Sequence, residues 1–470
     1  MMKIQFQSQK SKFGLALAVM LVAAYVLRHY LAFEVFRNQG FAWDMATFAN
    51  WQESLRDWGY DVYKYNPSFN YPSVFAAALG FVNWLGDSIA PVFFNNHPNI
   101  ARWSLLKLPS ILADIGVGFS VAMFGKKWFG QKVALWAAAL YLFLPVSWYD
   151  SAIWGQVDSL AALPMLLAIF FAIDKRYEVS AIFLVMAVLV KPQGILIVLI
   201  LIPLLVGLLL RKELSMRKVG SILLTGLISF VLLASPWSLE RYAPQSLQSI
   251  PVIGDLFGIA GQASYSGALF PVATANAYNI WGLVGNPSLA KSIEANRVYW
   301  INDKIDIFGF PIWAIGLILF FAACTFVWIK VQRDASPNSV LIGYGLLLVA
   351  FYVFPTRVHE RYLAQAFTAL ALVLAGSVLN RTVFAVLNIA NTINMHAILV
   401  APLKVIQPFS QPGSQAATTE PSSYTGSPAT FGLSDVSLPL LNSRDYPVVM
   451  TVILIQTLAV FYLSRLRKVK

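Results

Sequence analysis

Twelve apolar segments, distributed from one end of the chain to the other, constrain this sequence more than any other feature. A helix needs about 20 apolar residues to cross the hydrocarbon core of a bilayer. Only 12% of the residues are charged, against roughly 25% in soluble domains. The sequence therefore predicts an all-α, polytopic membrane protein with about 12 transmembrane helices. The segments lie near 13–33, 105–124, 131–148, 156–173, 179–190, 193–210, 218–235, 309–329, 338–354, 362–379, 382–402 and 447–463.

The basic residues predict the orientation of these helices. With the N-terminus in the cytoplasm, the termini and the loops on that side hold 19 of the 34 lysines and arginines but only four of the 22 acids. Short cytoplasmic loops carry such an excess of Lys and Arg. The net charge of +12 then follows from topology, and we expect no nucleic-acid partner. We predict a multi-pass protein of the cell membrane with both termini cytoplasmic and the first segment an uncleaved anchor.

Three long regions fall on the extracytoplasmic side. Regions 34–104 and 236–308 are rich in aromatic and turn residues, and 74–85 predicts a short interfacial or re-entrant helix. The third region, 403–446, includes a stretch at 407–430 rich in Ser, Thr, Pro and Gly, which predicts a flexible loop. We divide the chain into a multi-span region (1–402, with the first two loops), the flexible loop (403–446), and a last transmembrane helix with a basic cytoplasmic tail (447–470).

An acid, Asp44, follows the first segment and lies just outside the predicted bilayer. If the stretch to Trp58 is helical, Phe48, Trp51 and Leu55 share one face, with Asp44 at its start. A partly desolvated carboxylate there could act as a general base, because desolvation raises its pKa. The alternative is that Asp44 caps the helix or stabilises its dipole.

A second polar group, Trp154-Gly155-Gln156-Val157-Asp158, opens the fourth segment on the same side. Carboxylates and amides accept from and orient sugar hydroxyls, so Gln156 and Asp158 are candidates for binding a sugar or an acceptor. The glycine allows a close backbone approach. Two structural alternatives stay open: Trp154 as an ordinary interfacial anchor, and Asp158 as an N-terminal cap.

Charged residues also interrupt the apolar segments themselves. Lys191, in Lys191-Pro192-Gln193, must snorkel, pair with an acid or hold an anion. Lys107 and Asp114 lie in the second segment, where they could pair with each other across two helical turns, although we prefer pairing with neighbouring helices. His396 lies in the eleventh segment, and we interpret it as a packing residue.

Arg357, His359, Glu360 and Arg361 open the tenth segment. Two guanidinium groups and an imidazole at a lipid–water boundary suit a phosphate, because guanidinium forks bind its oxygens in pairs. The alternative is an internal salt bridge of Glu360 combined with contacts to lipid headgroups. Farther back in the second long loop, Asn279 could contact a carbohydrate or cap a turn. The spacing of cysteine and histidine suggests no zinc site.

Together these residues resemble the GT-C class of integral-membrane glycosyltransferases, in particular bacterial proteins related to GPI mannosyltransferase II. The resemblance covers most of residues 40–365, in an ordered series. The family usually has Tyr-Pro-Pro in the first outer loop, where this chain has Tyr71-Pro72-Ser73. The similar stretches are Asp44 with Thr47–Trp51, Asn70-Tyr71-Pro72, Leu106–Pro109 with Asp114, Trp154–Ser159, Lys191-Pro192-Gln193, Asn279-Ile280-Trp281 and His359–Tyr362.

The resemblance implies a GT-C type fold and a hexosyltransferase, mannose-like in specificity, that inverts the anomeric centre on the extracytoplasmic face. The donor would be a sugar on a polyprenyl phosphate, and the acceptor a glycan, lipid or protein. Asp44 would be the catalytic base, and Trp154, Gln156, Asp158 and Asn279 would bind sugar or acceptor. The donor phosphate would be bound by Lys191, Arg357, His359 and Arg361. No obligatory metal or other cofactor is implied, although a divalent ion would fit near the acids.

Two other functions use similar residues. A transporter or flippase of lipid-linked sugars would need the same cations for phosphate, but it should also carry polar residues along both halves of the membrane. A glycan polymerase or ligase shares both the chemistry and the architecture, and only the pattern around Asp44 argues against it. A structural scaffold would leave Lys191, Asp158 and the 357–361 cluster unexplained.

Overall fold

The computed structural model describes residues 2–88, 102–268, 271–282, 298–299, 302–399, 405–406 and 446–466. The stretch 407–430, almost all of the loop 403–446 that contains it, and tail residues 467–470 lie outside the described residues, so the predicted flexible loop and most of the basic tail are not described.

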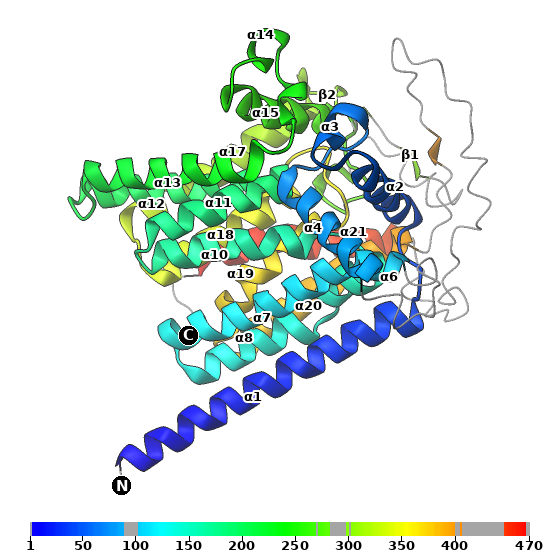
Figure 1. Cartoon of the computed structure of the whole chain (residues 1–470). Coiled ribbons are helices and arrows are strands. Elements are labelled where there is room, and N and C mark those ends of the chain that lie inside the picture. Colours follow the sequence, from blue (N-terminus) through cyan, green and yellow to red (C-terminus); the bar gives the residue numbers. More distant parts are fainter. Residues whose placement is uncertain are drawn as a thin grey trace.

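Helices lie side by side in a bundle (Figure 1). A helix overlaps each of the twelve predicted segments. Among the described residues, seven helical segments are long and apolar enough to cross a membrane alone. An eighth span would consist of two helical pieces, Gln131–Phe143 and Pro145–Trp154, bent by 44°. The helices are α1 (Met2–Tyr30), α7 (Leu108–Phe129), α8 (Gln131–Phe143), α10 (Asp158–Ile173), α11 (Tyr177–Val190), α12 (Val198–Leu210), α13 (Met216–Ala234), α17 (Ile312–Arg333), α18 (Pro337–Val353), α19 (Ala366–Val373), α20 (Val378–Leu399) and α21 (Tyr446–Arg465).

The predicted helical, polytopic membrane fold is confirmed, but four of the expected spans are shorter than a full crossing. They form apolar helices at Asp158–Ile173, Tyr177–Val190, Pro337–Val353 and Tyr362–Val373. The break after α11 has a local cause. Pro192 has no N–H to donate, so α11 ends at Val190, and Lys191 adopts an extended conformation with φ −152°.

Shorter elements connect the long helices, and α2, α3, α4 and α6 gather at one end of the bundle (Figure 1). Two small sheets pair β1 with β4 in parallel and β2 with β3 antiparallel. The elements are η1 (Leu31–Val35), α2 (Ala42–Trp58), η2 (Gly59–Asp61), α3 (Val62–Tyr65), α4 (Ser73–Ser88), α6 (Arg102–Leu106), α9 (Pro145–Trp148), η4 (Tyr149–Trp154), η5 (Pro192–Ile197), η6 (Leu239–Tyr242), α14 (Gln245–Gln248), α15 (Ile253–Ala268), η7 (Ile280–Gly282), η8 (Tyr362–Gln365), β1 (Val298–Tyr299), β2 (Asp306–Ile307), β3 (Phe310–Pro311) and β4 (Val405–Ile406).

The core of the bundle is formed by α7, α8, α10, α18 and α19. Almost every residue of α18 is buried, as expected for a helix that is apolar on all sides. A second apolar cluster joins α2, α4 and the start of α7. The predicted face of α2 is confirmed, because Phe48, Trp51 and Leu55 are all buried there. The predicted helix at 74–85 forms as part of α4.

Candidate active site

Asp44 lies in the first turn of α2 and contacts the loop before α10. The indole Nε1 of Trp154 donates to Asp44 Oδ2 at 2.8 Å. The backbones meet at the same place, since the Phe41 amide donates to the Trp154 carbonyl and the two rings stack. The Asp44 side chain is 15% exposed, and the N-cap residue of α2 is Phe41, not Asp44. Capping therefore does not explain Asp44, although its first-turn position still suits the helix dipole.

Asp158 and Lys191 form a buried ion pair. Lys191 Nζ donates to Asp158 Oδ1 at 2.6 Å, and neither side chain is more than 2% exposed. Antiparallel α10 and α11 bring the two residues together, because Asp158 begins the first helix and Lys191 follows the second. The Gln365 amide also donates to Asp158 Oδ1, at 3.0 Å. The N-cap residue of α10 is Val157, and Asp158 follows it as the first helical residue, so its ionic partner, not a cap, explains its position.

Arg361 connects the Asp44 and Asp158 groups. Its Nη2 is 3.9 Å from Asp44 Oδ2, and its Nε is 3.7 Å from Asp158 Oδ2. Its Nη1 donates to Glu360 Oε1 at 2.7 Å. The internal salt bridge of Glu360, which was the alternative to phosphate binding, is therefore formed. Burial opposes the charged form, but these three carboxylates raise the pKa of the Arg361 guanidinium well above its usual value. Arg361 is therefore a permanent cation at the centre of the site.

Aromatic rings surround the two cations. Lys191 Nζ lies 5.0 Å from the centre of the Tyr362 ring and 5.7 Å from that of Tyr71. The Arg361 guanidinium lies 5.8 Å from the Trp154 ring. Cations over ring faces at such distances are stabilised by the ring quadrupole. Burial is the main cause of a raised pKa for the Tyr71 phenol, which keeps this hydroxyl protonated.

Several buried polar atoms in this region have no hydrogen-bond partner among the described residues. They include both carboxylate oxygens of Asp150, Gln156 Nε2, Asp158 Oδ2 and Glu360 Oε2. Buried polar atoms are rarely left unpaired in proteins, so each such atom calls for a ligand or water. Their concentration around Arg361 and Lys191 marks a polar site within an apolar bundle.

Arg357 and Asn279 do not join this cluster. The Arg357 guanidinium pairs with buried Asp303 at 2.6 Å and donates to the Gly267 carbonyl. The Asn279 amide donates to the carbonyls of Tyr352 and Pro355, and its oxygen accepts from the Trp281 amide. Internal contacts thus engage both side chains, so we leave both out of the proposed binding site.

His359 lies beside the cluster, next to Tyr362 in a ring contact. Burial, with the positive charges of Arg361 and Lys191, lowers the pKa of His359 well below its usual value of 6.5. The imidazole is therefore neutral near pH 7. It can exchange hydrogen bonds with a phosphate but adds no positive charge to the site.

Two further predictions concern structural residues. Asp114 pairs with Arg28 of α1 at 2.8 Å, and Lys107 Nζ donates to the Ala152 carbonyl. The preferred pairing with neighbouring elements is confirmed, and the Lys107–Asp114 pair does not form. His396 Nδ1 hydrogen-bonds the Tyr149 hydroxyl at 2.7 Å, which confirms its packing role.

Sequence reasoning missed Asp150 and Gln365 as parts of the site. Asp150 lies before the Trp154–Asp158 stretch that the sequence pattern singled out, and it is buried in the η4 turn. Gln365 is four residues after Arg361, so a polar amide one helical turn from the cation was the available signal. No group of three or more Asp, Glu, His or Cys side chains suited to a metal ion is found in the described part of the chain.

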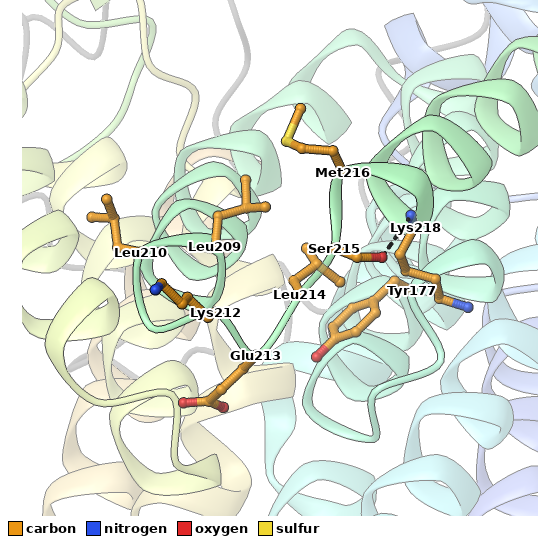
Figure 2. Close-up of a pocket in the computed structure, with 9 residues that line it drawn as sticks. All are labelled: Tyr177, Leu209, Leu210, Lys212, Glu213, Leu214, Ser215, Met216 and Lys218. Carbon is orange, nitrogen blue, oxygen red and sulfur yellow. Dashed lines mark hydrogen bonds between the residues drawn. The ribbon is translucent and has the colours of Figure 1, made fainter.

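A different pocket, of about 830 Å³, opens at the start of α11 and the end of α12, away from Lys191. Figure 2 shows its lining, with Tyr177, Lys212, Glu213 and Lys218 among the residues drawn. The Asp44–Arg361 cluster contributes no residue to it. These polar side chains belong to the loops predicted to be cytoplasmic.

No protein-family model matches the sequence, and no curated protein matches it. Solved structures of the oligosaccharyltransferase from Archaeoglobus fulgidus are similar at 13% identity and a TM-score of 0.44, covering 94% of this chain and 55% of that one. One is tethered to an acceptor peptide, and another, of the protein AglB, is in complex with an inhibitory peptide and a dolichol-phosphate. The chain thus spans little more than half the length of these proteins, and a likeness of this degree carries no argument about activity.

Proposed function

We propose that this protein is a membrane glycosyltransferase that moves a hexose from a polyprenyl-phosphate carrier to an acceptor hydroxyl. One observation carries the proposal. A partly exposed carboxylate, Asp44, lies 3.9 Å from Arg361, which in turn lies beside the buried Lys191–Asp158 pair. An acid next to one cation, with a second cation in the neighbouring ion pair, suits a reaction in which a hydroxyl loses a proton and a phosphate leaves.

Asp44 is the proposed general base. The Trp154 indole holds Asp44 Oδ2, which orients the carboxylate and leaves Oδ1 to accept a proton from the acceptor hydroxyl. The acceptor oxygen then forms a bond to the anomeric carbon while the bond from that carbon to the phosphate oxygen breaks. The electron pair of the broken bond stays on the lipid phosphate, and attack from the opposite face inverts the anomeric centre.

Lys191 and Arg361 are the proposed partners of the phosphate. An ammonium carries three donors and a guanidinium five. Among the described residues, Lys191 uses one donor on Asp158, and Arg361 uses one in its hydrogen bond to Glu360. Donors therefore remain for phosphate oxygens, and placing them where charge develops stabilises the leaving group. His359 would add a neutral hydrogen bond, while Trp154, Gln156 and Asp158 would bind sugar or acceptor.

The finer parts of the proposal are mannose as the sugar, a glycan, lipid or protein acceptor, and an extracytoplasmic site. The unpaired Gln156 Nε2 and Asp158 Oδ2 support a polyhydroxylated ligand, since an amide donor and a carboxylate acceptor match a sugar's hydroxyl groups. The location is supported by charge, because the basic loops lie at the other ends of the helices.

The test is transfer by purified protein in lipid nanodiscs, with radiolabelled polyprenyl-phosphate hexoses and a panel of acceptors. We expect Asp44→Asn to lower kcat by about 10²-fold to 10⁴-fold, the usual contribution of general-base catalysis. Asp57→Asn is the matched control, because Asp57 is an exposed acid on the same helix. Full activity of Asp44→Asn would remove Asp44 from the base role. Lipid movement across vesicles without any transfer would instead support a flippase.

A further inference from the structure

A second buried polar cluster is built around Asp114 of α7. Its Oδ1 accepts from the Tyr141 hydroxyl at 2.7 Å and from the Ser159 hydroxyl at 2.6 Å. Its Oδ2 accepts from Arg28 Nε at 2.8 Å and from the Ser151 hydroxyl at 2.6 Å. The Asp114 side chain is fully buried, and four donors satisfy its two oxygens. The proposed transfer reaction uses none of them.

Two of these donors lie at the ends of the segment 151–159, which we call the site loop. Ser151 precedes Trp154, and Ser159 follows Asp158, so one carboxylate binds both ends of the segment 151–159. Within that segment the Trp154 indole contacts Asp44, and Asp158 contacts Lys191. Residues 155–157 lie outside η4 and α10. Side-chain contacts there add to the backbone hydrogen bonds that Gly155 and Gln156 donate to the Asp150 carbonyl.

Arg28 of α1 makes this anchor rigid. Besides Asp114, its guanidinium donates to the Ala24 and Leu142 carbonyls and to the Ser147 hydroxyl. Arg28 also compensates the buried carboxylate, whose charge would otherwise be costly in an apolar environment. The anchor therefore connects α1, α7, α8 and the site loop through one ion pair.

We propose that Asp114 is a positioning residue, which holds the 151–159 segment by both ends and so fixes the separation between Trp154 and Asp158. This role in transfer rests on the proposed function. Asp44 is oriented by Trp154, and Lys191 and Arg361 are oriented by Asp158, so a displaced loop would separate the base from the phosphate-binding cations. Misplacement of reacting groups by about 1 Å can cost about a hundredfold in rate.

The chain offers a matched comparison for this proposal. Ser151→Ala with Ser159→Ala removes the two hydroxyl groups that tie the loop to Asp114 but leaves the Arg28–Asp114 pair intact. Tyr141→Phe removes one hydroxyl from the same carboxylate but leaves both serine hydroxyls in place. Loss of general stability would affect both variants, whereas loss of positioning would affect only the serine variant.

The experiment uses full-length protein labelled with 5-fluorotryptophan in nanodiscs, with the Trp154 ¹⁹F resonance assigned through Trp154→Phe. We expect this resonance to shift or broaden in the double serine variant and to stay in place in Tyr141→Phe. In the transfer assay, kcat should fall about tenfold to a hundredfold in the serine variant with KM changed less than about threefold. Single Ser151→Ala and Ser159→Ala variants provide the same readouts if the double variant fails to fold.

Each outcome decides between the two proposals. An unmoved Trp154 resonance in the serine variants would overturn the positioning role, whatever the activity. Equal shifts in the serine variants and Tyr141→Phe would also overturn it, because the effect would not be specific to the loop. A selective shift in a protein without transfer activity would support the positioning of the loop by Asp114 while contradicting the proposed function.

Discussion

Arg361 has the most charged surroundings of the residues in the site, with carboxylates of Asp44, Asp158 and Glu360 around one guanidinium. Such a group is not exchangeable for lysine, because the planar fork reaches several acceptors in fixed directions. Burial first, and repulsion from Asp44 among other contributions, raise the pKa of Glu360 above its usual value. The charged forms of these carboxylates are therefore stabilised by the guanidinium between them.

Replacing Arg361 with glutamine should both destabilise the protein and abolish transfer. Removing one partner of a buried ionic network leaves uncompensated charge, at a cost of about 3–5 kcal/mol. Arg56→Gln is the control, since its pair with Asp87 is largely exposed, and such pairs contribute about 0–1 kcal/mol. Thermal unfolding in detergent measures the difference. Equal effects of the two substitutions would contradict the central position of Arg361.

The lowered pKa of His359 predicts how the stability of the protein depends on pH. Its folded-state pKa lies well below 6.5, so below about pH 6.5 the unfolded chain binds a proton that the folded protein does not. The contribution of His359 to stability is therefore complete above pH 6.5 and is lost as pH falls toward the folded-state pKa, at up to about 1.4 kcal/mol per pH unit.

The measurement is chemical unfolding at pH 7.5 and pH 5.5 for the wild type and His359→Gln. Other groups titrate in both proteins, so only the difference between the two pH dependences is attributed to His359. We expect the variant to lose less stability on acidification. An identical loss in both proteins would mean that His359 is protonated in the folded state.

At the scale of elements, the site depends on how the loop before α10 contacts the start of α2. Gly155 has φ +90°, and a Cβ there would overlap Met45 Sδ. Gly40 faces the Trp154 carbonyl, where a Cβ would come within 2.8 Å of the oxygen. Glycines at these two positions allow the backbone before α2 to contact the backbone before α10. This contact brings Asp44 within hydrogen-bonding distance of the Trp154 indole.

Gly155→Ala should destabilise the protein by about 1–3 kcal/mol, because it adds both backbone strain and overlap with Met45. In a Met45→Ala background the same change should cost about 1 kcal/mol less, since the overlap is relieved. A double-mutant cycle of unfolding free energies measures this coupling. Additive effects would show that Met45 does not limit the space at Gly155.

At the scale of the whole molecule, the site residues and the basic loops lie at opposite ends of the helices. Asp158 and Lys191 lie at one end of α10 and α11, while Asp174 and Lys175 follow the other end of α10. The site and the basic loops are therefore on opposite sides of the bundle. From the positive-inside rule we therefore propose that the site lies outside the cytoplasm.

Labelling of intact cells with a membrane-impermeant maleimide tests this orientation. In a Cys324→Ser background, we expect Lys64→Cys, in the site-side helix α3, to react, and Arg217→Cys, in the α13 end near the basic loops, to react only after permeabilisation. Both positions are exposed, so access alone distinguishes them. The reverse pattern would place the site on the cytoplasmic side.

The sequence alone determined the helical membrane fold and the helical segments, because burial in lipid requires long apolar runs whose ends are visible as polar breaks. It also indicated Asp44, Asp158, Lys191 and Arg361, since charged groups at membrane depth are costly and stand out. It indicated the short span at 179–190, which ends before Pro192, but not that Asp158–Ile173, Pro337–Val353 and Tyr362–Val373 also fall short of a full crossing.

Only the tertiary structure decided which polar residues meet. Arg357 and Asn279 fit the same chemical pattern as Arg361 and Gln156, but Asp303 and backbone carbonyls engage them elsewhere. For Asp114 the sequence favoured a partner on a neighbouring helix without naming it, and the structure shows that Asp114 also binds both ends of the site loop. The physical reason is that ion pairs between distant residues depend on helix packing and loop geometry, neither of which is written in local sequence patterns.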